Sequence, residues 1–199
     1  AMANGGYVRG SAGRFNPTAA MTRGEAATVL DNLTGGGRAV AKADSGTYIG
    51  KVMKSNGTIA YQGIQYATHE RWEAPVMISG RSDVIPALNF GPNSIDGYEN
   101  DLNLVVYVNP NSTNPNKSVF MWQYGCGQRG GDTANYDWSG FVAENPDIIV
   151  VTPNHRGNFW GSIDLSQLQG YDAVADRYKY SNNLARLDLL TCLKWINKN

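Results

Sequence analysis

An α/β fold is the class that this sequence predicts, and three observations support it. Three short apolar runs, at residues 102–108, 118–123 and 148–152, are rich in β-branched and aromatic side chains and are bounded by Asn, Pro or Gly. Such runs are typical of strands buried on both faces of a sheet. Residues 138–144 could hold a helix, and residues 183–197 carry Leu and Ile at helical spacing, at 187, 190, 193 and 196. Strands that alternate with helices indicate an α/β sheet.

Residues 1–36 differ from the rest of the chain and are expected to contain one short amphipathic helix. Thr22 and Glu25 fit a capping box, in which the Thr hydroxyl accepts from first-turn amides and the Glu reaches back. Three glycines at 35–37 end this helix, and its apolar residues are Ala26, Val29, Leu30 and Leu33. Such a short helix must pack on another part of the protein. Residues 37–47 are small and polar, which predicts a linker.

β structure is expected to begin after this linker. Residues 48–54 and 58–64 flank Asn56-Gly57, a dipeptide favoured in hairpin turns, so a β-hairpin is predicted. Residues 68–98 are rich in Pro, Gly, Asn and Ser, which predicts a long irregular stretch.

Charge and composition exclude several classes of partner. Lys+Arg and Asp+Glu both number 17, so the net charge is zero, and we expect no nucleic acid partner. No apolar run reaches the roughly 18 residues that a membrane span needs. The two cysteines, Cys126 and Cys192, are too few for a disulfide framework and lack metal-ligand spacing, so they could pair or stay free.

The most informative segment is the glycine-rich turn that follows the second apolar run: Tyr124, Gly125, Cys126, Gly127 and Gln128. One interpretation is a tight turn that needs positive φ, which glycine adopts at no steric cost. The other is an oxyanion hole, because small residues let backbone N–H groups approach the negative charge that acyl transfer builds on a carbonyl oxygen.

Five segments, in the same order along the chain, resemble motifs of the type-B carboxylesterases and cholinesterases. They are GIQYA at 63–67 with Arg71-Trp72 ("GIPYA…RF"), residues 99–107 ("EDCLYLNVY"), 119–127 ("VMVWIHGGG"), 150–157 ("VVTINYRLG") and 187–196 ("LLDQRLALKWV"). Each match alone is weak, but five in the family's order make chance resemblance an unconvincing explanation.

The resemblance implies that residues 48–199 are the N-terminal part of an α/β-hydrolase fold with a central, mostly parallel sheet, incomplete at the C-terminus. It also implies a serine hydrolase of carboxylic esters, with a Ser–Glu/Asp–His triad whose Ser stands in a G-x-S-x-G turn. No such pattern occurs in this chain. Ser11 in RGSAG is a near miss that lacks the first glycine and does not follow a buried strand. The nucleophile is therefore expected beyond this chain.

By the same resemblance, this chain contributes the oxyanion loop and part of the pocket wall. The amides of Cys126 and Gly127 would stabilise the oxyanion, Gly125 would shape the turn, and Tyr124 and Gln128 would line the pocket. Cys126 departs from the family's middle glycine, and Gln128 replaces an aromatic residue. Neither a metal nor an organic cofactor is implied.

Two further departures concern residues outside the turn. Asp101 stands where many members have a disulfide cysteine, so that bridge is absent. His155 stands where the family usually has Tyr. Neither His155 nor His69 is placed where the family's catalytic base falls, so no catalytic role is expected for them.

Residues 1–36 resemble the later half of an S-layer homology repeat, at positions 6–10, 13–17 and 21–27. In that family the Thr-Arg-x-Glu-Ala helix belongs to a cell-wall-binding module. The resemblance implies a secreted protein of the bacterial cell surface, with cell-wall polymer as a possible partner. Because a single incomplete repeat matches, the segment is expected to be a docked remnant.

A sheet interrupted before its central strand would leave an unpaired edge and an uncovered apolar face. The expected partner is therefore the C-terminal remainder of the same protein, as a second chain, with a small-molecule ester as substrate. Two alternatives stay open. One is a non-catalytic carboxylesterase-like binding or adhesion protein at the cell surface. The other is a wall-anchored structural protein whose N-terminal segment carries the function.

Overall fold

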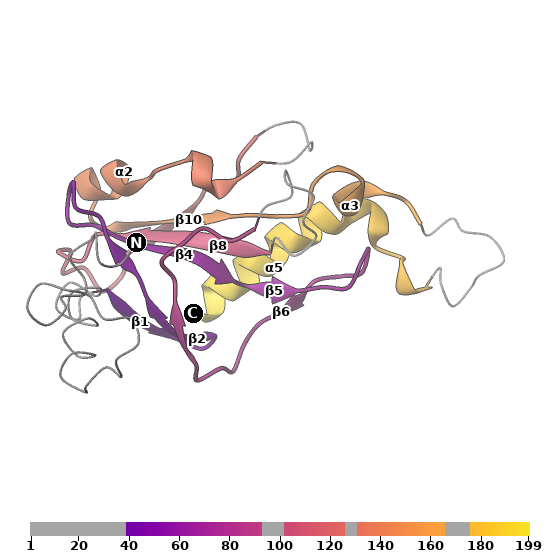
Figure 1. Cartoon of the computed structure of the whole chain (residues 1–199), viewed down its shortest axis with the longest axis horizontal. Coiled ribbons are helices and arrows are strands. Elements are labelled where there is room, and N and C mark those ends of the chain that lie inside the picture. The colour runs from indigo at the N-terminus through magenta and orange to yellow at the C-terminus, as the bar shows by residue number, and fades with distance from the viewer. Residues whose placement is uncertain (1–38, 93–101, 126–130, 166–175) are drawn as a thin grey trace, which may run out of the picture.

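A computed structural model of the chain describes residues 39–92, 102–125, 131–165 and 176–199 (Figure 1). The expected helix and S-layer-like segment at 1–36 lie outside these ranges. The largest sheet has the strand order β3 (Lys51–Val52), β4 (Ile59–Gln65), β8 (Asn103–Val108), β10 (Ile148–Pro153) and β9 (Ser118–Met121).

Two smaller sheets and several helices complete the described part. One sheet joins β1 (Val40–Ala43), β2 (Gly46–Ile49) and β7 (Val84–Pro86), and the other pairs β5 (Ala67–Thr68) with β6 (Val76–Met77). The helices are α2 (Ser139–Glu144), α3 (Asn158–Ser162) and α5 (Leu184–Lys198), with 3-10 turns at Thr133–Asn135 and Ser181–Asn183. In the described ranges, none of them is long and apolar enough to cross a membrane.

The five-stranded sheet is mixed, whereas a mostly parallel sheet was expected. Among its described strands, β9 and β10 form a parallel pair and every other pair is antiparallel. The connection between β9 and β10 contains α2, which supplies the long crossover that parallel neighbours need. The strands β3 and β4 are instead joined by a short hairpin loop, which forces an antiparallel pair.

The predicted hairpin forms, but over a shorter range than the sequence suggested. Lys51 pairs with Ala60 across the loop that contains Asn56-Gly57. Tyr48 belongs to a different hairpin, in which β2 pairs with β1 across part of the expected linker. The linker interpretation of residues 40–47 was therefore wrong, because β1 and the start of β2 form there and Ser45 is buried, with its carbonyl accepting from the Tyr48 hydroxyl at 3.1 Å.

Residues 68–98 were expected to be irregular. In their described part, up to residue 92, they include the short strands β6 and β7. Between and around these strands the backbone is otherwise turn or coil, as the Pro and Gly content indicated.

Side chains alternate along β8 and so separate two apolar layers. Val105 packs with Val142 of α2 on one face. Leu104 packs on the opposite face in the cluster that contains Cys192 and Trp195 of α5. Figure 1 shows α2 and α5 on opposite sides of the five-stranded sheet, which is the layering expected of an α/β fold.

The strand β9 lies at the end of this sheet and is not buried on both faces, as had been expected. Val119 and Phe120 keep 47% and 39% of their surface exposed, on opposite faces of the strand. The strands β8 and β10 do have the expected burial. The sequence pattern could not distinguish a buried central strand from a partly exposed edge strand, because an apolar run looks the same whether or not other elements cover it.

The helix α5 was correctly predicted, but its buried face was not. The residues that face the protein are Leu184, Asp188, Thr191, Cys192 and Trp195. Of the residues that share helical spacing, Ile196 packs against the core, whereas Leu190 and Leu193 are about half exposed. The reason is that a charged residue, Asp188, occupies the buried face through a specific ion pair described below.

Gly63 forms a bulge in β4 that leaves no room for a side chain. The register between β4 and β8 shifts between Tyr61 and Ile64. The φ angle of Gly63 is +73°, and a Cβ atom there would lie 2.4 Å from the carbonyl oxygen of Asn89. Gly63 is therefore required both by its backbone conformation and by close approach of another segment.

We expect Gly63→Ala to lower the free energy of unfolding by about 2 to 4 kcal/mol, from positive-φ strain plus overpacking. Gly57→Ala is the matched control, because φ of Gly57 is +72° but a Cβ there meets no atom within 4 Å. It should cost about 1 kcal/mol. The difference between the urea unfolding midpoints of the two variants measures the cost of the steric clash with the Asn89 carbonyl. Equal midpoints would contradict that clash.

Candidate active site

The parallel strands β9 and β10 end at the same edge of the sheet, and the candidate site lies there. The amide of Trp122 donates to the Val151 carbonyl at 2.9 Å, which continues the ladder past the end of β9. The chain then passes through Tyr124 and Gly125, while β10 continues into Asn154 and His155. Two segments distant in sequence are thus brought together at the strand ends, where α/β sheets place their sites.

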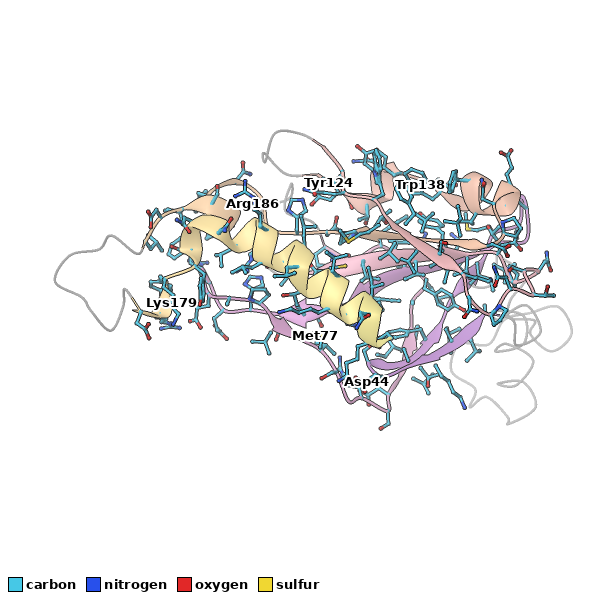
Figure 2. The ribbon with its side chains drawn as sticks, turned by 180° about the vertical axis from the view of Figure 1, so that it is seen from behind. Asp44, Met77, Tyr124, Trp138, Lys179 and Arg186 are labelled. Carbon is cyan, nitrogen blue, oxygen red and sulfur yellow. The ribbon has the colours of Figure 1, made fainter. Side chains whose placement is uncertain are left out.

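Tyr124 and His155 form a buried stack at this edge. Their ring centroids lie 4.9 Å apart with an interplanar angle of 13°. The Tyr124 hydroxyl donates to the His155 carbonyl and accepts from the His155 amide, both at 3.3 Å. Each residue is only 5% exposed. In Figure 2, Tyr124 lies on the same side of the sheet as Trp138, whereas α5 crosses the other side.

Gly131 packs against the same tyrosine. A Cβ atom at Gly131 would lie 2.0 Å from Cδ2 of Tyr124. Such a contact is impossible for a real side chain, so the glycine backbone packs directly on the ring. The Tyr124 ring therefore contacts both Gly131 and His155.

A buried amide network fixes the segment that follows Gly131. The Oδ1 atom of Asn154 accepts from the Thr133 amide at 3.1 Å, and its Nδ2 donates to Oδ1 of Asn103 at 3.2 Å. Asn103 begins β8 and Asn154 follows β10, so the antiparallel register brings them to the same edge. Buried polar groups paired in this way hold a single arrangement.

Arg156 joins the end of β10 to α5 through a buried ion pair with Asp188. The Arg156 guanidinium donates to both carboxylate oxygens, with Nη2 to Oδ1 at 2.7 Å and Nε to Oδ2 at 3.0 Å. The Arg156 amide adds a third bond to Oδ2 at 3.0 Å, and Nη1 donates to the Glu73 carbonyl at 2.8 Å. The two side chains are 1% and 0% exposed, so every charged group here is satisfied inside the protein.

His155 is held in one tautomer by its neighbour. Its Nδ1 lies 3.1 Å from the Arg156 carbonyl, and since a carbonyl only accepts, Nδ1 carries the proton of the neutral ring. Nε2 is buried and has no hydrogen-bond partner among the described residues. Burial lowers the pKa of His155 from its ordinary value of 6.5, although the bond to Arg156 and the charge of Asp188 act in the opposite direction.

This pKa shift has a consequence for stability. Because the folded pKa lies below the unfolded one, the unfolded state binds more protons as pH falls. The stability contribution of neutral His155 is fully present above about pH 6.5 and is lost as pH falls through the folded pKa, by at most about 1.4 kcal/mol per pH unit. We expect the urea unfolding midpoint of His155→Phe to change less between about pH 7 and about pH 5 than the midpoint of the unmodified protein. An equal change of the midpoint with pH in both proteins would contradict this.

The expected site residues are only partly within the described ranges. Cys126, Gly127 and Gln128 lie outside them, so the assigned roles of their amides and side chains stay predictions. Gly125 is exposed and does not have positive φ. Tyr124 is buried, with its ring against His155 and Gly131.

Sequence reasoning missed the Arg156–Asp188 pair and the role of Asn154. A signal for the pair was present, because Arg156 and Asp188 each lie in one of the segments that carry the family resemblance. His69, by contrast, is half-buried away from this stack, with Nδ1 3.0 Å from the Glu70 carbonyl.

The described residues offer no cluster of three His, Cys, Asp or Glu side chains that could hold a metal ion. Cys192 is a free thiol within the core, and burial raises its pKa to about 12, so it stays protonated at neutral pH. It lies in the layer under α5 rather than in the site.

A β-sheet with helices on both faces is the layering of an α/β protein. Comparison with solved structures agrees. A carboxylesterase of Geobacillus stearothermophilus aligns with a TM-score of 0.65 at 24% identity, over 81% of this chain and 34% of that chain, which shows the fold. A PNB esterase aligns with a TM-score of 0.65 at 28% identity, over 81% of this chain and 34% of that chain.

The chain belongs to the carboxylesterase family, whose model matches residues 38–199. It is similar to the para-nitrobenzyl esterase of Bacillus subtilis (strain 168), with 30% identity in an alignment of 176 residues that covers 77% of this chain and 34% of the relative. The chain thus spans about a third of the length of the relatives that it matches.

Proposed function

We propose that this chain is the N-terminal part of a serine carboxylesterase that hydrolyses carboxylic esters. In this proposal the chain contributes the oxyanion turn that follows β9, and a Ser beyond residue 199 attacks the ester carbonyl. The amides of Cys126 and Gly127 stabilise the tetrahedral oxyanion, and water then releases the acid.

The observation that carries this proposal is the family match over residues 38–199 together with the position of the turn. Tyr124 follows the end of β9 by three residues, and the backbone of Gly131 packs against the Tyr124 ring. An oxyanion hole needs backbone donors held in place before the reaction begins. The contact between Tyr124 and Gly131, which flank the residues assigned to the oxyanion hole, supports the proposal.

The remainder of the carboxylesterase domain is proposed as the partner that covers the open faces of this chain. An apolar groove of about 290 Å³ lies beside β9, lined among others by Val108, Val119, Ile149 and Ile196. On the other face, Phe120 packs against Trp122, Trp138 and Phe141 at tilted or edge-on angles, in a partly exposed aromatic cluster. Exposed apolar surface on both sides of an edge strand fits a further strand and helices of the same domain.

The test is an intact mass of the purified native protein under denaturing conditions, with a p-nitrophenyl ester assay on the same sample. Hydrolysis that an organophosphate blocks, together with a polypeptide that contains both this chain and a downstream G-x-S-x-G, or a second polypeptide that supplies it, is the expected result. Absence of turnover in a protein that does contain this pattern would overturn the proposal. It would leave the non-catalytic binding protein as the better explanation.

A further inference from the structure

We propose that the loop between β5 and β6, residues 69–75, is a strained latch that closes on the connection between β10 and α3. Trp72 is its closing residue. The latch opens as a local unit, without unfolding of the five-stranded sheet, and its opening loosens the segment that leaves β10 at the edge where the candidate site lies. This opening is a conformational property of the described residues, and it would exist whether or not the complete protein hydrolyses esters.

Trp72 has a backbone conformation that is unfavourable for a residue with a side chain. Its φ angle is +57°, in the left-handed region, where the Cβ atom approaches the following carbonyl oxygen. Glycine is the usual residue there, and a bulky side chain is an outlier. Such a conformation persists only where surrounding contacts hold it. The closed loop is therefore strained, and loss of those contacts would let Trp72 relax.

The ring of Trp72 makes contacts that can hold this conformation. The indole stacks on Trp160 of α3, with ring centroids 5.7 Å apart and an interplanar angle of 24°, and it meets Tyr178 edge-on at 6.3 Å. The Arg71 guanidinium lies 4.9 Å from the centroid of the Trp160 ring. The indole N–H of Trp72 is buried, and nothing within the described ranges accepts its hydrogen. Contact with other rings, rather than a hydrogen bond of the indole, thus keeps the loop closed.

Glu73 fastens the loop at two further points. Its carboxylate forms an ion pair with Arg177, whose side chain is 56% exposed, so this pair contributes little to closure. Its backbone carbonyl accepts from Nη1 of Arg156 at 2.8 Å. Opening removes that bond but leaves the three bonds between Arg156 and Asp188 in place. The connection between β10 and α3 would therefore loosen without losing its buried ion pair.

The base of the hairpin is held more firmly than its tip. Tyr66, which directly precedes β5, is fully buried, and its hydroxyl donates to the Asn154 carbonyl at 2.8 Å. Beyond this point the ladder between β5 and β6 has only two residue pairs. In Figure 1 the hairpin extends beside α5 toward α3, where Trp72 meets Trp160. A fixed base with a tip held by side-chain contacts favours local opening, which costs less than global unfolding.

The test is hydrogen exchange of backbone amides in the complete protein, with the amides of the β4–β8 ladder as the reference for global unfolding. We expect the amides of the loop and of α3 to exchange together, well before those of the ladder. Trp160→Leu should speed loop exchange roughly 10- to 100-fold, because it removes the ring on which Trp72 stacks. Trp72→Phe keeps an aromatic ring and should change loop exchange by less than about fivefold.

Two substitutions at one position test the strain. Trp72→Ala and Trp72→Gly both remove the ring and should both speed loop exchange. Exchange in Trp72→Gly should nevertheless be roughly two- to fivefold slower than in Trp72→Ala, because only alanine is strained at positive φ. Ala74→Gly is the matched control, since Ala74 lies in the same loop without positive φ. Glycine at that position should speed exchange relative to the unmodified protein.

Limited trypsin digestion gives an independent measurement. Cleavage after Arg71 needs the open loop, whereas cleavage after Arg81, an exposed residue outside the latch, serves as the internal reference. Trp160→Leu should raise cleavage after Arg71, relative to cleavage after Arg81, by about the factor found in hydrogen exchange.

Three results would overturn parts of the proposal. Loop amides that exchange only together with the β4–β8 ladder would mean that no local opening exists. Unchanged exchange and unchanged trypsin cleavage in Trp160→Leu would mean that the stack does not close the loop. Faster exchange in Trp72→Gly than in Trp72→Ala would exclude stored strain. If Trp160→Leu does not fold, the comparison of Trp72→Ala with Trp72→Phe decides whether the stack closes the loop.

Discussion

Asp188→Ala is expected to destabilise the protein by about 3 to 5 kcal/mol, because it leaves the Arg156 guanidinium charged and uncompensated inside the fold. The carboxylate of Asp188 accepts three hydrogen bonds from Arg156, and both side chains are almost fully buried. A buried charge without its partner costs far more than the same charge at the surface. A shift of the urea unfolding midpoint to lower concentration measures the loss.

The control for this substitution is Asp83→Ala, which removes an exposed carboxylate 3.3 Å from Arg81. That surface pair should contribute less than about 1 kcal/mol. Asp188→Asn should lie close to Asp188→Ala, since an amide keeps one acceptor but cannot neutralise the guanidinium. If the Asp188 variants shift the midpoint no more than Asp83→Ala does, the ion pair does not stabilise the fold.

The α/β class, the three strands and α5 could be predicted because each depends on short-range pattern. Apolar runs bounded by turn residues define β8, β9 and β10, and helical spacing defines α5. What could not be predicted is which side of an element is covered. Leu190 and Leu193 have the spacing of a core stripe, yet Asp188 takes the buried face because Arg156, distant in sequence, neutralises it.

The candidate site shows the same division between local and distant information. The glycine-rich turn after β9 was predicted from the residues themselves and from their resemblance to a family motif. The contacts of Tyr124 and Thr133 with His155 and Asn154 could not be predicted, because they depend on the pairing of β9 with β10 and of β10 with β8. The sequence showed a histidine where the family usually has tyrosine, but not that its ring stacks on Tyr124.

Val119→Lys is expected to cost the complete protein more than about 3 kcal/mol, although Val119 is 47% exposed in this chain. The reason is the proposed partner. Val119 lines the apolar groove beside the edge strand β9, and a downstream strand and helix that fill this groove would bury the side chain. A lysine there would lose the burial of the valine and would also bring an ammonium group into an apolar layer.

Val76→Lys provides the control, because Val76 also lies in a strand, is 65% exposed and does not line the groove. Both substitutions lower stability by the same small amount, about 1 kcal/mol or less, because lysine has a lower β-propensity than valine. The difference between their urea midpoints in the complete protein therefore isolates coverage of the groove. A large difference means that the remainder of the domain packs on β9; equal, small shifts would mean that this face stays open to water and that the partner binds elsewhere.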